Sequence, residues 1–258
     1  MTKNSSAAAL RALHVPGTPV VLPNVWDAAS AGLVAEAGFA AVATSSGAVA
    51  EALGRSDQEG APVAEMFAVA ERVAAAVDVP VTVDAEAGYG LGAEEFVRRL
   101  LATGAVGCNL EDTAHTGGRS VRRDAAEQAA WLAAVRAAAG DRLVINARVD
   151  GFIAARAAGM PESEALGDVL DRARRYAAAG ADCVYPILAA EERTIDALVT
   201  GLGDVPVNAN PRPDGPSIAR LADLGVARIS LGTGLWRAQQ SWLRATLTGL
   251  TEGRLPGS

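Results

Sequence analysis

The sequence predicts a single α/β domain over residues 1–258, folded as one (β/α)8 TIM barrel, and three observations support this prediction. The length of 258 residues is usual for one such barrel. Short runs rich in Val, Ile and Ala alternate with longer segments of helical apolar spacing, which is the pattern of parallel β/α units. Glycine follows several of the helical segments, where a left-handed residue commonly ends a helix.

Eight runs are the expected strands, and a helical segment follows each. The strands are Val20–Pro23, Ala41–Thr44, Val79–Asp84, Val106–Glu111, Leu143–Arg148, Cys183–Ile187, Val205–Ala209 and Ala227–Leu231. The helices are Ala28–Ala37, Val63–Ala76, Ala93–Thr103, Ala125–Ala139, Pro161–Ala179, Glu191–Leu202, Pro216–Leu224 and Leu235–Thr251. Residues 1–15 form an N-terminal extension, and residues 235–258 form a C-terminal helix and tail. An open doubly wound sheet is the alternative, but NVWDAAS after the first strand lacks its phosphate-binding glycines.

Composition limits the chemistry and the partners. The formal net charge is −7 without a long basic run, so we expect neither nucleic acid nor an anionic membrane as a partner. No apolar run approaches the ~20 residues of a membrane span, and we expect a cytoplasmic protein. Cys108 and Cys183 lie in apolar runs and should be buried and reduced. The only lysine, Lys3, should lie in a frayed terminus, which excludes Schiff-base and P-loop chemistry.

Charged residues gather where the expected strands end. Asp84 and Glu86 end the third strand, Glu111 ends the fourth, and Arg148 ends the fifth. Barrel enzymes place their catalytic groups at this face. Converging carboxylates repel one another unless a cation or a proton lies between them, and oxygen ligands with few histidines suit Mg²⁺. The alternative is that these acids cap helices, and for Asp112 alone we favour the cap.

Arg148 and two small-residue segments complete the expected site. The guanidinium of Arg148 suits a bidentate clamp on a substrate carboxylate or phosphonate, or else an ion pair with Glu111 or Asp84. The segment Ser45-Ser46-Gly47 offers backbone N–H groups to an anion, although an ordinary helix cap competes with this interpretation. Trp26 is either a pocket wall or a core residue. The long connections 45–62 and 112–124 are expected to cover the site.

These motifs resemble the isocitrate lyase and phosphoenolpyruvate mutase superfamily. The segments that carry the resemblance occur in the family's order: LPNVWDAASAGLVAEAGFAAVATSSG, LGRSDQEG, VPVTVDAEAGYG, GAVGCNLED, NARVDGF and AGADCVYPI. The resemblance implies a barrel that binds Mg²⁺, or alternatively Mn²⁺, and stabilises an enolate. It also implies homo-oligomers, dimers or tetramers, that exchange a C-terminal helix.

The resemblance implies a role for each site residue. Asp84 matches the direct metal ligand and also contacts substrate, while the acids that match the holders of metal-bound water are Asp57, Glu86 and Glu111. The residues that match substrate-binding positions are Trp26, Ser45, Ser46, Gly47 and Arg148. Arg148, Glu111 and His115 are the catalytic candidates.

The chain departs from its family in the connection after Glu111. This segment reads DTAHTGGRSVRRD, without the Lys-(Lys/Arg)-Cys-Gly-His loop of the isocitrate and methylisocitrate lyases. It also lacks the gating lysine of the phosphonate enzymes, and Tyr185-Pro186-Ile187 replaces their His-x-Ser. His115 and Arg119 are left as acid/base or anion-binding candidates, although for His115 we favour an exposed loop histidine.

Three functions are compatible with these residues. The first is a Mg²⁺-dependent lyase that cleaves a C–C bond of a small 2-oxo or hydroxy polycarboxylate, similar to oxaloacetate or methylisocitrate. The second is a P–C bond mutase or hydrolase acting on a phosphonopyruvate-like substrate. The third is a barrel that binds an oxo acid without turnover. Unpaired buried acids are costly, which counts against the third.

Overall fold

The computed structural model describes residues 3–116, 118–213 and 215–255, and it confirms the predicted α/β architecture. Every predicted strand run contains a strand, and a further short strand, β2, follows the first run after Pro23. The parallel strands are β1 (Val20–Leu22), β2 (Asn24–Val25), β3 (Val42–Thr44), β4 (Val81–Asp84), β5 (Gly107–Glu111), β8 (Val144–Val149), β9 (Cys183–Pro186), β10 (Asn208–Ala209) and β11 (Arg228–Ser230).

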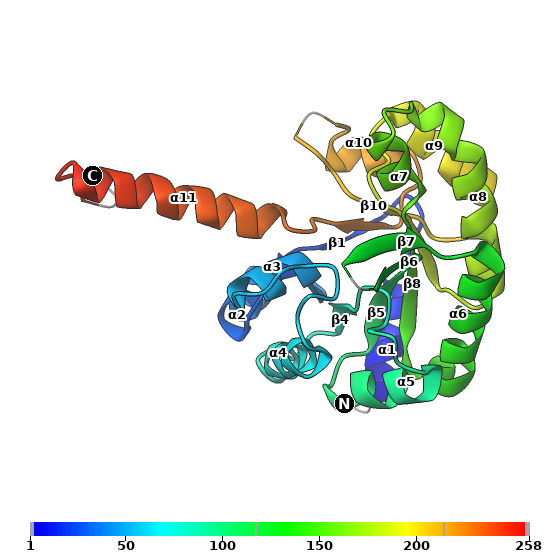
Figure 1. Cartoon of the computed structure of the whole chain (residues 1–258), viewed down its shortest axis with the longest axis horizontal. Coiled ribbons are helices and arrows are strands. Elements are labelled where there is room, and N and C mark those ends of the chain that lie inside the picture. Colours follow the sequence, from blue (N-terminus) through cyan, green and yellow to red (C-terminus); the bar gives the residue numbers. More distant parts are fainter. Residues whose placement is uncertain (1–2, 117, 214, 256–258) are drawn as a thin grey trace.

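Helices surround these strands, as Figure 1 shows. They are α1 (Lys3–Ala12), α2 (Ala28–Glu36), α3 (Ser46–Ala52), α4 (Val63–Ala75), α5 (Ala93–Ala102), α6 (Ala125–Ala139), α7 (Gly151–Ala157), α8 (Glu162–Ala178), α9 (Glu192–Leu202), α10 (Ile218–Asp223) and α11 (Gly234–Thr251), with a short 3-10 helix at Gly140–Arg142. The eight predicted helices are all present. The sequence pattern missed α1 in the N-terminal extension, and α3 and α7, which have only seven residues each.

The strands follow one another around the barrel in two hydrogen-bonded sheets. Their orders are β2-β3-β4-β5-β8-β9 and β1-β11-β10, and each pairing is parallel. A single parallel bridge between Val184 and Val207 connects the sheets at one seam. At the other seam the chain itself passes from β1 to β2 through Pro23, which has no N–H for a ladder. The carboxyl ends of the strands therefore share one rim.

The N-terminal extension is an ordered helix, so the expectation of a frayed terminus was wrong. Leu10 of α1 is fully buried against Val106 and Val144, which lie at the amino ends of their strands. Arg11 donates through Nε to Asp182 Oδ1 at 2.6 Å. Helix α1 is stable because it covers apolar surface that the barrel would otherwise expose at its amino end.

The connection after β5 is a hairpin of β6 (Thr113–Thr116) and β7 (Arg119–Arg122), where we expected a loop. Thr113 pairs with Arg122 and His115 pairs with Ser120 across this antiparallel ladder. Gly118 takes a φ of 73°, which glycine adopts without steric cost. The ladder fixes the position of His115 relative to the end of β5.

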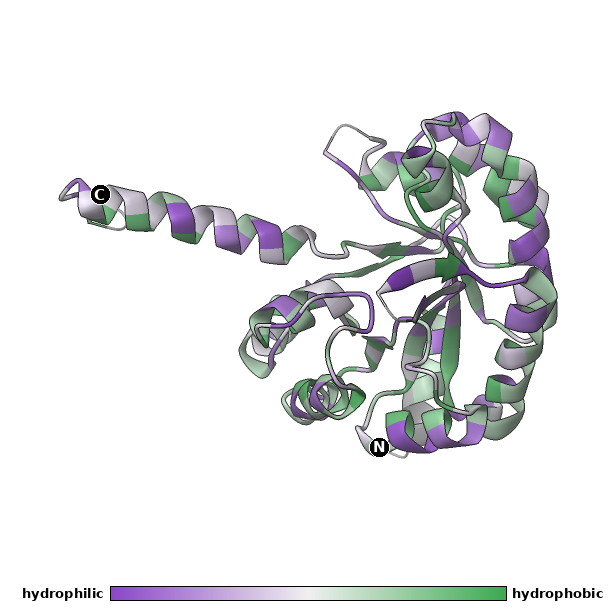
Figure 2. Cartoon of the chain, viewed as in Figure 1, coloured by the Kyte–Doolittle hydropathy of each residue, from purple (hydrophilic) through white to green (hydrophobic). Residues whose placement is uncertain are grey.

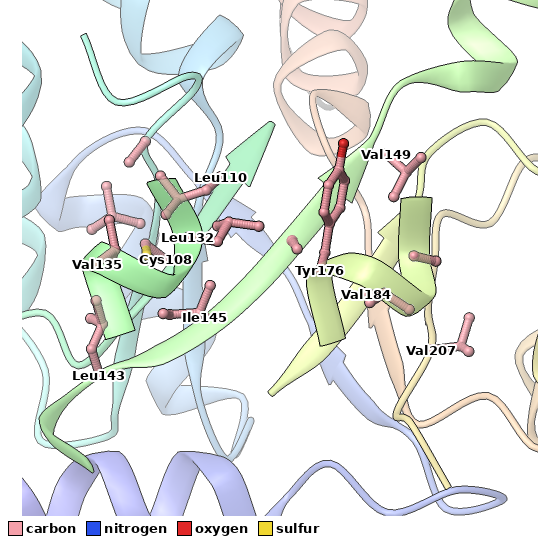
Figure 3. Close-up of a cluster of buried hydrophobic side chains, with 14 of the residues drawn as sticks. Cys108, Leu110, Leu132, Val135, Leu143, Ile145, Val149, Tyr176, Val184 and Val207 are labelled. Carbon is pink, nitrogen blue, oxygen red and sulfur yellow. The ribbon is translucent and has the colours of Figure 1, made fainter. Parts of the chain in front are cut away.

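The main core lies between the strands and the helices. Figure 3 shows Cys108 and Ile145 of the sheet beside Leu132 and Val135 of α6. All four side chains are fully buried. Cys108 and Cys183 are free and buried, which confirms that prediction.

Helix α11 projects away from the barrel in Figure 1. Trp236 in its first turn packs edge-on against Trp26, with ring centroids 5.1 Å apart. Farther along, Trp242 is 63% exposed and Leu247 is 52% exposed. Apolar and polar residues alternate along the helix in Figure 2. Within the described residues, no helix is long and apolar enough to cross a membrane.

Candidate active site

A cavity of about 620 Å³ opens at the carboxyl ends of the strands. Of the ten residues predicted for the site, nine line it: Ser45, Ser46, Gly47, Asp57, Asp84, Glu86, Glu111, His115 and Arg148. Trp26 is not among the lining residues, because its ring packs against Trp236. Arg119 is exposed on the hairpin and does not line the cavity either.

Asp84, at the end of β4, is held on one side only. Its Oδ2 accepts hydrogen bonds from Ser46 N at 3.1 Å and Ser46 Oγ at 2.9 Å. Its backbone N donates to Thr44 Oγ1 at 3.0 Å. Its Oδ1 is buried and has no hydrogen-bond partner among the described residues. A buried carboxylate oxygen without a donor is costly, so this atom is a strong acceptor for a cation or a substrate proton.

Glu86 lies beside Asp84 in an environment that disfavours its charge. Burial, and to a lesser degree the nearby carboxylates of Asp57 and Asp84, raise the pKa of Glu86 to about 8. The backbone N of Glu59 donates to Glu86 Oε2. Gln58, Glu59 and Glu86 have φ values of 64°, 56° and 48°, a region that non-glycine residues seldom occupy. Such strained backbone persists where the fold fixes it, commonly at functional sites.

The donor set fits one hydrated divalent ion. Among the described residues, no group of three or more His, Cys, Asp or Glu side chains is arranged as ligands to one metal. The family resemblance assigns direct contact to Asp84 and water-mediated contact to the other acids, which needs no such group. Mg²⁺ commonly keeps several waters and uses one or two carboxylates. The unpartnered Asp84 Oδ1 is the atom best placed to contact it.

Arg148 is buried and held between two carboxylates. Its NH1 lies 2.5 Å from Glu111 Oε2, which confirms the ion pair considered from the sequence. Its Nε and NH2 donate to both oxygens of Asp150, at 2.7 and 3.0 Å. Asp150 was missed as a site residue, although its spacing of two from Arg148 places both on the same side of a strand. These contacts fix the guanidinium and leave N–H groups on NH1 and NH2 for a substrate.

His115 contacts Glu111 directly, so the interpretation of an exposed loop histidine was wrong. Its Nε2 lies 2.5 Å from Glu111 Oε1, its Nδ1 lies 2.9 Å from Ser120 Oγ, and its side chain is 8% exposed. The hydrogen bond with Glu111 raises the pKa of His115. Burial raises the pKa of Glu111 to about 7, against the opposing charge of Arg148. Both shifts favour a proton held between Glu111 Oε1 and His115 Nε2.

Asp112 is not a helix cap, which corrects the interpretation from sequence. Asp124 caps α6, and its side chain accepts from two N–H groups of the first turn. Asp112 is fully buried and accepts from Tyr176 Oη at 2.9 Å, Arg172 NH1 at 3.0 Å and Asp150 N at 2.9 Å. It connects α8 to the end of β8, and through Asp150 it supports Arg148.

The segment Ser45-Ser46-Gly47 caps helix α3 and brings its backbone close to Asp57 and Thr233. Ser45 is the N-cap of α3, and its Oγ accepts from Ala48 N at 3.4 Å. A Cβ on Gly47 would lie 3.0 Å from both Asp57 Oδ2 and Thr233 Cγ2, so only glycine fits there without displacing the wall. Whether this segment also binds an anion stays a prediction.

Residues 10–251 match the model of the phosphoenolpyruvate phosphomutase family. The chain belongs to this family. A provisionally named phosphonomutase from Burkholderia cenocepacia is 42% identical, with a TM-score of 0.87 over 95% of this chain and 98% of that chain. An uncharacterized protein from Mycobacterium tuberculosis is 33% identical over 221 residues, which cover 86% of this chain and 80% of the relative.

The family includes both lyases and mutases. The 2,3-dimethylmalate lyase of Eubacterium barkeri is 30% identical over 190 residues, which cover 70% of this chain and 63% of the lyase. The chain therefore spans less than two thirds of that lyase. The predicted superfamily is confirmed, and its membership supports an enzyme.

Proposed function

We propose that this protein is a Mg²⁺-dependent lyase that cleaves a C–C bond of a small 2-oxo or hydroxy polycarboxylate through an enolate. The observation that carries this proposal is the buried, unpartnered Asp84 Oδ1, fixed by Ser46 in the cavity that Arg148 also lines. A cation held there, with Mn²⁺ as an alternative to Mg²⁺, would stabilise negative charge on a substrate oxygen. Asp57, Glu86 and Glu111 would hold its water ligands.

Arg148 and the His115–Glu111 pair perform the remaining steps. The free N–H groups of Arg148 bind the substrate carboxylate, while Asp150 and Glu111 keep the guanidinium in one orientation. For a hydroxy-acid substrate, the His115–Glu111 pair takes the hydroxyl proton as the C–C bond breaks, the carbonyl forms and the electron pair passes to the enolate; His115 Nε2 then returns a proton to the enolate carbon. Its hydrogen bond with Glu111 raises its pKa, which keeps the imidazole protonated to a higher pH and suits it to donate a proton.

A second candidate is a P–C bond mutase or hydrolase acting on a phosphonopyruvate-like substrate. The family match and the name of the Burkholderia relative favour it. The same charged groups would serve, because both reactions develop charge on the oxygen of a 2-oxo acid. The composition of the hairpin counts against it, since no lysine is present there. A non-catalytic binder is disfavoured by the cost of keeping Glu86 and Glu111 buried without use.

One experiment separates these functions. The protein is incubated with Mg²⁺ and oxaloacetate, methylisocitrate, isocitrate, malate-type hydroxy acids or phosphonopyruvate, and products are followed by ¹H and ³¹P NMR. We expect C–C cleavage of a carboxylic substrate, lost in Asp84→Ala. Phosphorus products alone would favour the mutase or hydrolase, and binding of oxalate without turnover of any substrate would favour the binder.

We also propose that α11 packs on a second copy of the chain, as part of a dimer or tetramer. Trp242, Leu243, Leu247 and Leu250 are each at least 39% exposed, and a projecting helix with this much apolar surface is unstable alone in water. Light scattering after size exclusion should give an oligomeric mass for the wild type. A Trp242→Glu/Leu247→Glu variant should be a monomer, and a wild-type monomer would contradict the proposal.

A further inference from the structure

Polar side chains occupy the interior of the barrel directly below the cavity. The interior of a TIM barrel is usually filled by branched apolar side chains. Residues two apart on a strand share one face, so the residue two positions before a cavity-lining one lies beneath it. The buried polar residues in these positions, which we call the polar layer, are Thr82, Asn109, Asn146, Asn208 and Ser230, below Asp84, Glu111, Arg148, Asn210 and Gly232.

Arg228 brings a positive charge into the polar layer. Its side chain is fully buried. Its Nε donates to Ser230 Oγ at 3.2 Å, and its NH2 donates to Asn109 Oδ1 at 3.0 Å. Within the described residues, no carboxylate forms an ion pair with Arg228, and its NH1 has no hydrogen-bond partner. A buried charge that is paired only with neutral groups lowers the stability of a fold, so this arginine needs a reason beyond packing.

The guanidinium of Arg228 reaches across the barrel toward Asp84. Strands β11 and β5 belong to different sheets, so the hydrogen bond from Arg228 to Asn109 crosses the interior. Asn109 is paired in register with Asp84 on β4. The guanidinium therefore lies one strand away from the carboxylate that we assign to the cation.

Electrostatics connect the same two residues. Burial lowers the pKa of Arg228, and the charge of Asp84 is among the influences that oppose this shift. The other groups that oppose it are neutral at pH 7, because burial raises the pKa of each one: they are Cys183, Tyr185 and Cys108. In the part of the chain that the structure describes, Asp84 and Arg228 are the only charged side chains that keep a buried atom without a partner. Each therefore provides the charge that the other lacks.

A fixed positive charge near a cation site acts in opposite directions on the ion and on an anionic ligand. It repels the ion and so weakens its binding. It attracts an anion that the ion holds, and it favours negative charge that develops on a substrate oxygen. Without the ion, it reduces the repulsion among the converging carboxylates.

Resting on the proposed function, we propose that Arg228 is a positioning residue of the cation site. Its charge beneath Asp84 lowers the affinity of the protein for Mg²⁺ and raises the affinity of the Mg²⁺-loaded protein for an anionic 2-oxo acid. Arg228 contacts neither the ion nor the substrate, because it lies in the layer below the cavity. It acts through Asp84 and takes no part in bond cleavage.

Two calorimetric titrations test this role, first with Mg²⁺ alone and then with oxalate in saturating Mg²⁺. Arg228→Met removes the charge and keeps most of the side-chain length. It should bind Mg²⁺ about tenfold more tightly than the wild type, and the loaded variant should bind oxalate several-fold more weakly. Arg228→Lys keeps the charge and should keep both affinities near those of the wild type. A merely structural role would weaken both affinities in Arg228→Met.

The matched control is Arg136→Met, which removes an arginine that pairs with Asp182 at the amino end of the barrel. This variant should lose stability and keep both affinities. If Arg228→Met does not fold, Arg228→Met/Asn109→Leu replaces donor and acceptor together by apolar groups, a change that buried polar pairs often tolerate. The same two titrations then apply to the double variant.

The outcomes separate this inference from the proposed function. Unchanged Mg²⁺ affinity in the folded variant without the charge, or weaker binding of both probes, would overturn the inference and leave the proposed function standing. Arg228→Lys behaving like Arg228→Met would also overturn it. Failure of the wild type to bind Mg²⁺, with oxalate or without it, would overturn the proposed function and this inference together.

Discussion

Asp182 at the amino end of the barrel and Asp84 at the carboxyl end are both largely withdrawn from solvent, but their surroundings differ. Asp182 accepts from Arg11 Nε at 2.6 Å, from Ile145 N at 2.7 Å and from Arg136 NH2. Within the described part of the chain, the side chain of Asp84 accepts from Ser46 alone and keeps Oδ1 without a partner. A carboxylate whose two oxygens both accept hydrogen bonds holds secondary-structure elements together. A carboxylate with an unpartnered oxygen can bind a ligand, and it lowers the stability of the fold.

The largest expected effect is on Asp84. Asp84→Asn should lower turnover by about 10³- to 10⁴-fold, because the amide removes the negative charge that the cation needs. Its free energy of unfolding without Mg²⁺ should stay equal or rise. Steady-state kinetics and urea titration measure both, with the exposed Asp78→Asn as the control. A large loss of stability would show that Asp84 is a structural acid like Asp182.

Asp182→Asn should produce the opposite pattern. Two arginines would lose their shared carboxylate, and breaking a buried ion pair costs about 3–5 kcal/mol of unfolding free energy. Turnover at a temperature where the variant is folded should stay within a few-fold of the wild type. Urea titration against Asp171→Asn, which is 73% exposed, gives the comparison. Unchanged stability would contradict our account of the amino end.

Buried His14 at the amino end of the barrel should make the free energy of unfolding depend on pH. Burial lowers its pKa to about 4 from 6.5, and its Nε2 has no partner among the described residues. As the pH falls below 6.5 the unfolded chain takes up this proton before the folded chain does, so stability decreases until about pH 4. The loss is about 2.5 kcal/mol at pH 4.5 relative to pH 7.5. His14→Gln should remove this part of the pH dependence in urea titrations, and parallel curves would refute the assignment.

His115 tests the carboxyl end of the barrel by kinetics, with an effect smaller than that expected for Asp84. His115→Gln should lower turnover about 10²-fold, the lower limit for a lost proton donor. The raised pKa of His115 keeps it protonated above its ordinary range, so wild-type activity should fall as the pH rises through that value. The variant should lose this limb of the pH profile. An unchanged profile would mean that another group delivers the proton.

Much of this organisation was predictable from short-range patterns. Apolar runs of four to six residues predicted the strands, because a buried parallel strand needs nearly continuous hydrophobicity. Once the strands were located, the acids at the ends of the third and fourth strands were predictable as site residues, because the carboxyl ends of all the strands meet at one rim of the barrel. The role of Asp112 was not predictable, because its partner Arg172 lies 60 residues away. The burial of His115 was not predictable either, because the β6–β7 hairpin that places it beside Glu111 was expected to be a loop.

The sequence by itself determined the order of β and α units, the family, and the charged residues that meet at one rim. The tertiary structure decided which oxygen of Asp84 stays open, that Asp150 and Glu111 share Arg148, and that α1 covers the amino end of the barrel. It also decided that the guanidinium of Arg228 lies inside the barrel, one strand away from Asp84. The physical reason is that periodicity assigns a residue to a face, whereas hydrogen bonds and cavities depend on distances between elements far apart in the chain.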